Sequence, residues 1–155
     1  MHPKAKGELT EAIIRAELMK FGHIVLRPEG DNQRYDLVLD TPDGFKRVQC
    51  KTGRLLKNGT IVFSVASVRS NMKGSRRRDY HGDIELFAVF CYENGETYLV
   101  PIEHVGVSNC SLRVAPLPKT GSGGKTTLWA ETYRLKAMQG LLMPVPNPER
   151  GWEAK

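Results

Sequence analysis

The chain has 155 residues, of which 40% are hydrophobic and 26% are charged, a composition typical of a globular domain and not of a disordered tail. Its net charge of +6 and its pI near 9.3 favour an anionic partner such as nucleic acid. No segment approaches the roughly 18 apolar residues of a membrane span, and the first residues lack the apolar run of a signal peptide. We therefore expect one soluble, cytoplasmic domain over residues 1–155.

The first predicted element is an amphipathic helix over residues 7–21. Its apolar residues, from Leu9 to Phe21, recur at three- and four-residue steps, and Gly22 follows as a helix stop. Residues 23–28 then predict a strand, and a polar loop leads onward from it. The sequence therefore opens with a helix followed by β-structure.

The next two predicted strands form a hairpin. Residues 35–40 are an apolar run that indicates burial on both faces, and the turn 41–44 places Pro and Gly where a turn favours them. The following strand, residues 45–52, contains the stretch RVQCKTG, in which apolar Val48 and Cys50 alternate with Gln49 and Lys51. Gln and Lys on one face are ordinary residues of a solvent-facing strand, so alternation alone does not indicate a site.

The second half of the chain predicts shorter strands joined by turns. A turn at 57–60 leads into the strand 60–67, and the segment 66–79 is polar, basic and without a core face, so we expect a loop there. The remaining predicted elements are a hairpin of 83–90 with 97–101, a short helix at 101–105, a strand at 112–116, a flexible loop at 116–127 and a helical tail beyond residue 128.

Cysteine and histidine usage excludes several kinds of site. The three cysteines are widely spaced and make no CxxC pair, so neither a disulfide framework nor a zinc site is indicated. The histidines are scattered singly, which argues against an HNH nuclease. The segment GSGGKTT is not a Walker A loop, because Lys119 stands where that motif requires Gly.

Four polar residues fall into a pattern that suits phosphodiester hydrolysis. Glu11 lies on the opening helix and Asp36 at the start of the strand 35–40, beside the strand that carries Gln49 and Lys51. Magnesium takes oxygen ligands, chiefly carboxylates, and a neighbouring ammonium stabilises charge that develops on a phosphate. The hairpin brings these groups together, so the sequence predicts a metal-assisted nuclease site.

The chain resembles the PD-(D/E)xK nucleases, whose core is a helix, a strand carrying Asp and a strand carrying (D/E)xK. The matching segments here are RYDLVLD, with Asp36, and RVQCKTG, with Gln49 and Lys51. The segment KGELTEA resembles the helix start of the Holliday junction resolvase branch and places a metal-site Glu at Glu11. Together with YHGDIELFAVF and YLVPIEHVG, these segments look most like the branch of intron-encoded homing endonucleases, over residues 6–129.

This resemblance implies an α/β, restriction-endonuclease-like core in which a mixed central sheet is flanked by helices. It also implies a catalytic set of Glu11, Asp36, Gln49 and Lys51. The implied cofactor is Mg²⁺ or Mn²⁺, with Glu11, Asp36, Gln49 and the backbone carbonyl of Cys50 as ligands. Gln49 stands where the motif has an acid, and its amide oxygen brings no negative charge. We therefore expect Glu11 and Asp36 to supply the charge.

Structural alternatives exist for several of these residues. Glu11 could pair with Arg15 one turn along the helix, and Glu8 competes for its role. Tyr80 and Glu85 match the resembled family; packing of Tyr80 and a structural role of Glu85 are the alternatives to a catalytic role, and the sequence leaves both open.

The basic residues form a candidate DNA-binding set. Basic side chains beside a nuclease site would bind phosphates, although a solvated basic loop is the competing interpretation of residues 66–79. The candidate residues are Arg54, Lys57, Arg69, Lys73, Arg76, Arg77, Arg78, Lys119 and Lys125.

The sequence thus predicts a divalent-metal-dependent endonuclease of double-stranded DNA, of the homing type. Two alternatives remain: a Holliday junction resolvase of the same fold, and a DNA-binding module that has lost the chemistry. The resemblance also implies a homo-oligomer, either a dimer or a tetramer, because so small a chain needs several copies to read a long site.

Overall fold

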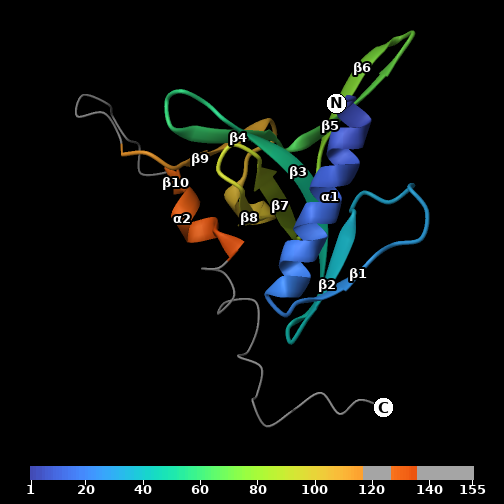
Figure 1. Cartoon of the computed structure of the whole chain (residues 1–155). Helices are drawn as coiled ribbons and strands as arrows, with labels where there is room; N and C mark the ends of the chain where they lie inside the picture. Colours follow the sequence, from blue (N-terminus) through green and yellow to red (C-terminus); the bar gives the residue numbers. More distant parts are fainter. Residues whose placement is uncertain (117–126, 136–155) are drawn as a thin grey trace, which may run out of the picture.

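The computed structural model describes residues 1–116 and 127–135 (Figure 1). The elements in this part of the chain are, in order, α1 (Pro3–Lys20), β1 (Ile24–Leu26), β2 (Leu37–Thr41), β3 (Gly44–Leu55), β4 (Thr60–Ser64), β5 (Ala66–Asn71), β6 (Gly74–Asp79), β7 (Leu86–Cys91), β8 (Glu96–Pro101), the 3-10 helix η1 (Ile102–His104), β9 (Asn109–Arg113), β10 (Leu128–Trp129) and α2 (Ala130–Tyr133).

Helix α1 starts earlier than the sequence predicts. The helix begins at Pro3, whose fixed φ suits the first turn, and the His2 side chain caps it. The buried face is narrower than expected, because it consists of Thr10, Ile14 and Leu18, while Leu9 is 40% exposed. The chain leaves the helix at Gly22, whose φ of 84° lies in the left-handed region that favours glycine.

The central sheet has the order β1-β2-β3-β7-β8. Strand β3 pairs antiparallel with β2 and parallel with β7, and β7 pairs antiparallel with β8. Both predicted hairpins, β2–β3 and β7–β8, are confirmed. Strand β2 is buried on alternate residues only, so the prediction that both of its faces are buried was wrong. Its apolar run reflects packing against α1 on one face and partial cover on the other.

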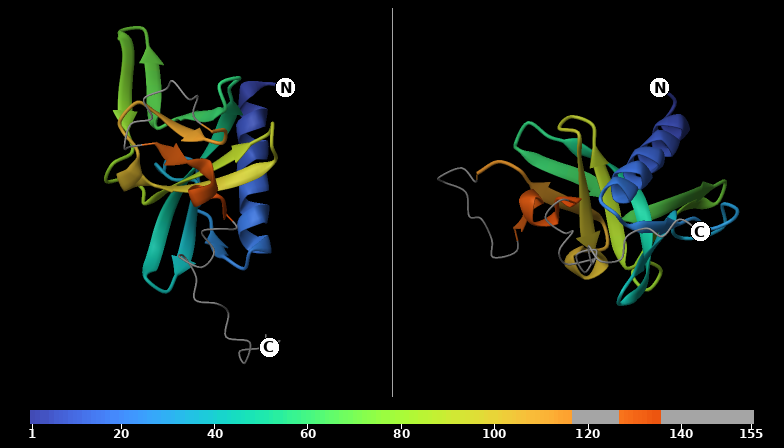
Figure 2. Two further views of the ribbon diagram at one scale, coloured as in Figure 1. Left: turned by 90° about the vertical axis from the view of Figure 1, so that its left-hand side faces the viewer. Right: turned by 60° about the horizontal axis from the view of Figure 1, so that its bottom comes forward.

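Two hydrophobic cores lie on opposite faces of this sheet. The helix-side core packs α1 against β2, β3 and β7 through residues such as Ile14, Leu37 and Val48. The strand-side core packs β4, β9 and α2 against β7 and β8, through residues such as Phe63 and Phe87. The segment β10–α2 thus lies across the sheet from α1 (Figure 2). Both cores converge on β3, which is covered from each side.

Strand β3 is long enough to join two sets of strands. It has 12 residues, and after leaving β2 it pairs with β4 through Arg54 and Leu55. Strand β4 pairs antiparallel with β9, and β9 pairs parallel with β10. At Gly53 an added Cβ would lie 2.7 Å from Ile61 Cγ2, so this crossing needs glycine.

Residues 66–79 form a β-hairpin, which corrects the predicted loop. Strands β5 and β6 pair from Ala66 with Asp79 to Asn71 with Gly74, and Gly74 turns the chain with a φ of 127°. Among the described residues, this hairpin pairs with no other strand, and Figure 1 shows it projecting from the body of the domain. It lacked the apolar alternation of a predicted strand because neither face enters a core.

The last elements partly match the predictions. The predicted short helix is η1, and the predicted late strand lies earlier, in β9. The predicted helical tail begins as β10 and then forms the short helix α2. The rest of that tail and the loop containing Lys119 and Lys125 lie outside the described residues. None of the described helices is both long and apolar enough to cross a membrane.

Candidate active site

The candidate site lies where β2 and β3 separate. Strand β2 begins at Leu37, opposite Val48, so the next residues of β3 have no β2 strand beside them. Asp36 fills this position: its N–H donates to the Val48 carbonyl at 2.9 Å, and its Oδ2 accepts the Cys50 N–H at 2.8 Å. The same Oδ2 accepts the Gln49 side-chain amide at 2.7 Å. The hairpin therefore brings Asp36 and Gln49 together, as the sequence predicts.

Gln49 and Lys51 point away from α1, toward the strand-side core. In the parallel register Gln49 lies beside Phe87 and Lys51 beside Val89, and both of these neighbours are fully buried. Both polar side chains are themselves only partly exposed. The amide of Gln49 and the ammonium of Lys51 thus lie at the border of a hydrophobic core. The alternative interpretation, that these residues form an ordinary solvent-facing strand surface, does not hold.

Glu11 approaches Asp36 from α1. It forms an ion pair with Arg27 at 3.4 Å and not with Arg15, whereas Glu8 is exposed. Glu11 and Asp36 line a shared pocket of about 200 Å³, whose other walls come from residues 27–35. The pocket gives solvent and small ions access to both carboxylates.

Burial raises the pKa of Asp36, and repulsion from Glu11 adds to the rise. The Cys50 N–H, Lys51 and Gln49 act in the opposite direction but do not cancel it. The negative charge of ionised Asp36 is therefore not fully balanced by the protein groups around it. A site in this electrostatic state attracts a cation. Burial also raises the pKa of the Cys50 thiol well above its usual value, so this thiol stays protonated and is a poor nucleophile.

The arrangement of helix, Asp strand and Gln-x-Lys strand is matched by comparison with known proteins. The sequence model of the PD-(D/E)XK endonuclease family matches residues 1–136. The chain belongs to this family. It is thus a nuclease of the PD-(D/E)XK type.

A solved structure of the same fold supports this membership. The structure of a bacterial homing endonuclease, I-Ssp6803I, matches with a TM-score of 0.68 and 25% sequence identity. The match covers 91% of this chain and 97% of the other. No curated protein sequence matches the chain significantly.

The donors present fit a hard divalent cation in part. Within residues 1–116 and 127–135, no three His, Cys, Asp or Glu side chains gather as a metal-binding group. Two carboxylates, Glu11 and Asp36, share the pocket, and the side-chain amide of Gln49, which contacts Asp36, carries a further oxygen. Such a donor set suits Mg²⁺, which takes few protein carboxylates and retains water.

Glu85 and Tyr80 have different surroundings in this PD-(D/E)XK endonuclease. Glu85 pairs with Arg47 at 2.6 Å and also accepts the Arg47 backbone N–H, and these bonds lower the pKa of Glu85. Glu85 thus joins β3 to the start of β7, in agreement with a structural role. Tyr80 instead accepts a hydrogen bond from Lys51 Nζ at 3.3 Å. No sequence signal links these two residues, which lie 29 positions apart.

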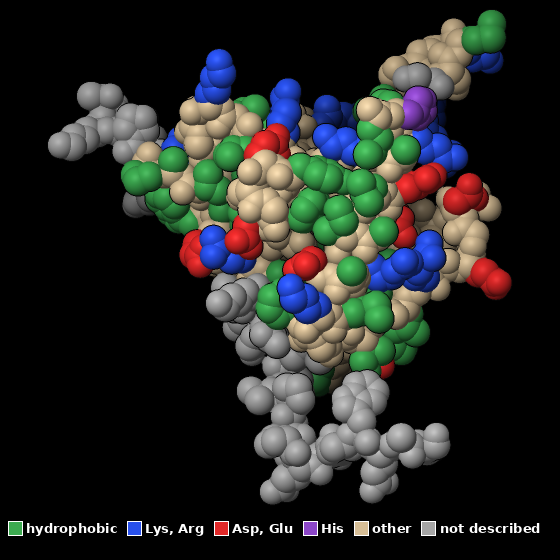
Figure 3. Space-filling view, in the orientation of Figure 1, with side chains coloured by type: hydrophobic (Ala, Val, Ile, Leu, Met, Phe, Trp, Pro, Cys, Tyr) green, Lys and Arg blue, Asp and Glu red, His purple; other side chains and the backbone are tan. Residues whose placement is uncertain are grey.

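The predicted DNA-binding residues fall into two regions. Arg54 and Lys57 are exposed near the β3–β4 turn, and the others that the structure describes lie on the β5–β6 hairpin. Two hairpin residues already have protein partners, because Arg77 donates to the Ser108 carbonyl and Arg78 pairs with Asp83 at 3.0 Å. Figure 3 shows Lys and Arg side chains along the upper border of the molecule, where this hairpin projects.

Proposed function

We propose that this PD-(D/E)XK nuclease is a divalent-metal-dependent, site-specific endonuclease of double-stranded DNA, of the homing type. The observation that carries the proposal is the hydrogen bond from Gln49 to Asp36 at the point where β2 and β3 separate, with Lys51 two residues further along β3 and close enough for its charge to act on Asp36. The likeness to a bacterial homing endonuclease over most of both chains supports the choice of substrate and type.

Glu11, Asp36, Gln49 and the Cys50 carbonyl would hold the metal, Mg²⁺ or Mn²⁺. When bound, the cation supplies an activated water and compensates charge at the scissile phosphate. The two carboxylates contribute the negative charge that Gln49 does not. Because Arg27 pairs with Glu11, a bound cation would replace Arg27 as the partner of this carboxylate.

Lys51 would stabilise the negative charge that develops on the phosphate during hydrolysis. Within the described residues it forms no ion pair with a carboxylate, although its charge acts on Asp36 from a longer distance, and its ammonium donates to the Tyr80 hydroxyl. The ammonium is therefore not neutralised by a direct ion pair before the substrate binds. Gln49 would orient Asp36, since its amide donates to Asp36 Oδ2 at 2.7 Å.

The β5–β6 hairpin would bind the DNA backbone. Residues directly opposite each other in an antiparallel pair share a face, so Arg69 and Arg76 lie on the same face of the hairpin. Both are exposed, as is Lys73 in the turn. Arg54, Lys57, Arg77, Arg78, Lys119 and Lys125 complete the proposed set. Phosphate contacts of this kind position the protein without reading sequence.

A homo-oligomer is part of the same proposal, with a second copy of the chain on the β1 side of the sheet. Strand β1 is an edge strand, and its Ile24 lies opposite Asp40, which in turn lies opposite Phe45. Ile24 is 57% exposed and Phe45 is 66% exposed on this shared face, an unusual position for large apolar side chains. Sedimentation of the free protein tests the assembly.

One cleavage experiment separates this function from its rivals. The protein is incubated with a linear duplex, a supercoiled plasmid and a four-way junction, with Mg²⁺ or with EDTA, beside a Lys51→Ala control. Discrete Mg²⁺-dependent cuts in linear duplex support the homing endonuclease. Cuts confined to the junction would replace it with the resolvase, and DNA binding without cleavage would replace it with the inactive module.

A further inference from the structure

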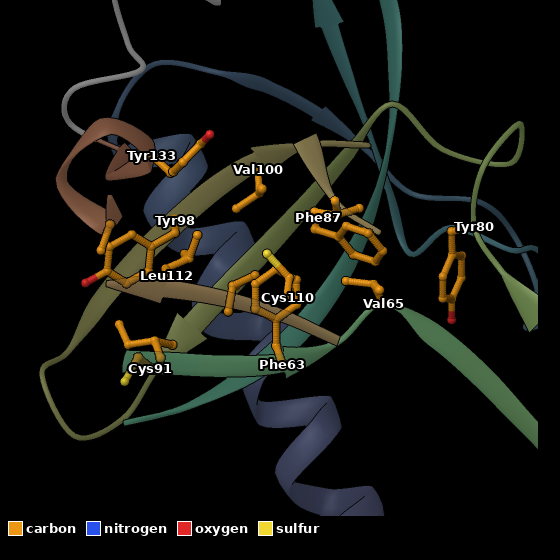
Figure 4. Packing of buried hydrophobic residues seen from close by; sticks show 14 of the residues in the cluster. Phe63, Val65, Tyr80, Phe87, Cys91, Tyr98, Val100, Cys110, Leu112 and Tyr133 are labelled. Carbon is orange, nitrogen blue, oxygen red and sulfur yellow. The ribbon is translucent and has the colours of Figure 1, made fainter. Parts of the chain in front are cut away.

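Tyr80 holds the Lys51 ammonium through two contacts. It follows directly after β6, is 5% exposed, and packs its ring edge-on against Phe87 at 5.5 Å between centroids. Lys51 Nζ lies 4.9 Å from the ring centroid and donates to the Tyr80 hydroxyl at 3.3 Å. Figure 4 shows Tyr80 at the margin of the strand-side core, beyond Phe87. The ring is thus anchored in the core, while its hydroxyl meets the motif lysine.

Arg34 fixes Tyr80 from another direction. Its guanidinium carbon lies 4.2 Å from the Tyr80 ring centroid, a stacking distance for a cation and an aromatic ring. The guanidinium also donates to Asp83 Oδ2 at 3.1 Å, to the Ser67 hydroxyl and to the Asp79 carbonyl. Ser67 and Asp79 belong to β5 and β6, so Arg34 joins the base of the hairpin to the segment that leads to Asp36.

We propose that Tyr80, held by Arg34, is a positioning residue for Lys51, and that the two residues connect the β5–β6 hairpin to the active site. The inference rests on the proposed function, since it assigns Lys51 to the phosphate. A lysine side chain loses rotamer entropy when it is fixed. Tyr80 imposes this order before substrate binds, and a neutral phenol does so without neutralising the ammonium, as a carboxylate would.

The same contacts transmit the position of the hairpin. A shift of β5 or β6 moves Ser67 and Asp79, and these residues hold Arg34 against the Tyr80 ring. Phosphate contacts on the hairpin therefore influence the position of the Lys51 ammonium. DNA that does not reach the hairpin leaves Lys51 less well placed, so this connection favours cleavage of DNA that is fully engaged.

The decisive variant is Tyr80→Phe, which removes the hydroxyl and retains the ring that Arg34 and Phe87 contact. We expect the single-turnover cleavage rate to fall by roughly 10- to 100-fold, the effect of losing one hydrogen bond to a charged group. DNA affinity and thermal midpoint should stay unchanged. The matched control is Tyr98→Phe, which removes another buried tyrosine hydroxyl, bonded to Asn94 at 2.8 Å, at the other end of the strand-side core from Tyr80 (Figure 4).

Two outcomes of the kinetic experiment overturn the proposal. One is a Tyr80→Phe rate equal to that of the wild type. The other is an equal loss in Tyr80→Phe and Tyr98→Phe, which would assign the effect to general stability. In an Arg34→Lys background the loss caused by Tyr80→Phe should shrink, because the ring is then already less firmly held. If the effects of Arg34→Lys and Tyr80→Phe on the cleavage rate were fully additive, Arg34 would not help to position Tyr80.

A second measurement does not depend on cleavage, so failure of the proposed nuclease activity can be told apart from failure of this inference. The nuclear magnetic resonance signals of the Lys51 ε-methylene group, assigned by their loss in Lys51→Ala, should be displaced by the Tyr80 ring in the free protein. In Tyr80→Phe the hydrogen bond that holds the ammonium beside the ring is lost, so these signals should move toward those of exposed lysines. Signals that coincide with those of exposed lysines in the wild type would contradict the proposal.

Discussion

The side-chain amide of Gln49 donates to Asp36 Oδ2 at 2.7 Å, so the residue at the acidic position of the motif stabilises the neighbouring acid. A carboxylate at this position would instead repel Asp36, whose pKa is already raised by burial and by Glu11. Glutamine therefore lowers the electrostatic repulsion around Asp36, and it offers the proposed metal one negative charge fewer than an acid would.

Exchanging this amide for an acid should reverse that balance. We expect Gln49→Glu to lower the thermal midpoint in EDTA, because a third carboxylate joins Glu11 and Asp36. Added Mg²⁺ should raise the midpoint more in the variant than in the wild type, since the variant site carries more negative charge. Thermal unfolding with and without Mg²⁺ measures both effects. An unchanged thermal midpoint in EDTA would mean that a carboxylate at position 49 does not repel Glu11 and Asp36.

Asp36→Asn should separate stability from activity. The folded-state pKa of Asp36 is raised, so this group favours the folded state at low pH, and that contribution is lost as pH rises through the folded-state pKa. At neutral pH without metal, the variant should therefore unfold at a higher temperature than the wild type. The difference should vanish below the unfolded-state pKa, 3.8, where both forms are neutral.

Cleavage by Asp36→Asn should fall by at least roughly 100-fold, because a metal-site charge is lost. The measurements are thermal unfolding in EDTA at several pH values and single-turnover cleavage in Mg²⁺. A variant that is less stable than the wild type at neutral pH, or that still cleaves at a similar rate, would remove Asp36 from the proposed role.

The carboxylate on α1 should control the metal requirement. We expect Glu11→Gln to lose most of its cleavage at low Mg²⁺ and to need a higher concentration for half-maximal rate, because one of two charged ligands is gone. Glu8→Gln is the matched control, since Glu8 lies on the same helix but is exposed. The check is a Mg²⁺ titration of the cleavage rate for both variants. Equal titration curves for wild type and Glu11→Gln would point to Glu8 or to no helical ligand.

The hairpin residues should differ in their effect on salt dependence. Replacing Arg69, Lys73 and Arg76 with Ala should flatten the slope of log K against log salt by up to roughly 2.7 per subunit, about 0.9 for each phosphate contact. Replacing Arg77 and Arg78 should flatten it less per charge, because these residues already contact Ser108 and Asp83.

Salt titrations of binding to cognate and random duplexes test this comparison. Both DNAs should respond alike, since phosphate contacts carry no sequence information. If none of the variants altered the slope of log K against log salt, we would assign the DNA contacts to Arg54, Lys57 and the 119–125 segment instead.

His23 should make the protein sensitive to mild acid. Its side chain is 4% exposed, neither ring nitrogen has a hydrogen-bond partner among the residues that the structure describes, and burial lowers its pKa below 6.5. As pH falls from 6.5 toward the folded-state pKa of His23, the unfolded chain binds a proton and the folded chain does not. The free energy of unfolding therefore decreases over this pH range. We expect His23→Leu to flatten this dependence in urea unfolding between roughly pH 7 and pH 5. A wild type of constant stability over this range would contradict the expectation.

Local patterns predicted the hairpins and the motif strands, because alternation and turn residues fix strand pairing over short distances. Asp36 beside Gln49 follows from one tight turn at residues 41–44. The contact between Lys51 and Tyr80 could not be predicted in this way, since it depends on where β6 returns to β7. The hairpin at 66–79 was missed for a related reason: its strands are stabilised by cross-strand pairing and by polar contacts such as that of Arg77, not by an apolar face.

The separate pairing of β5 with β6 has a consequence for how such a protein can change over time. Because the hairpin joins no other strand in the described part of the chain, residues can be inserted or deleted near its turn without breaking the ladders of the main sheet. Each such change alters how far the proposed DNA-binding arm extends, while the Arg34 anchor at its base remains. The length of DNA backbone that the protein spans can thus change by remodelling one appendage, at little risk to the proposed hydrolytic centre.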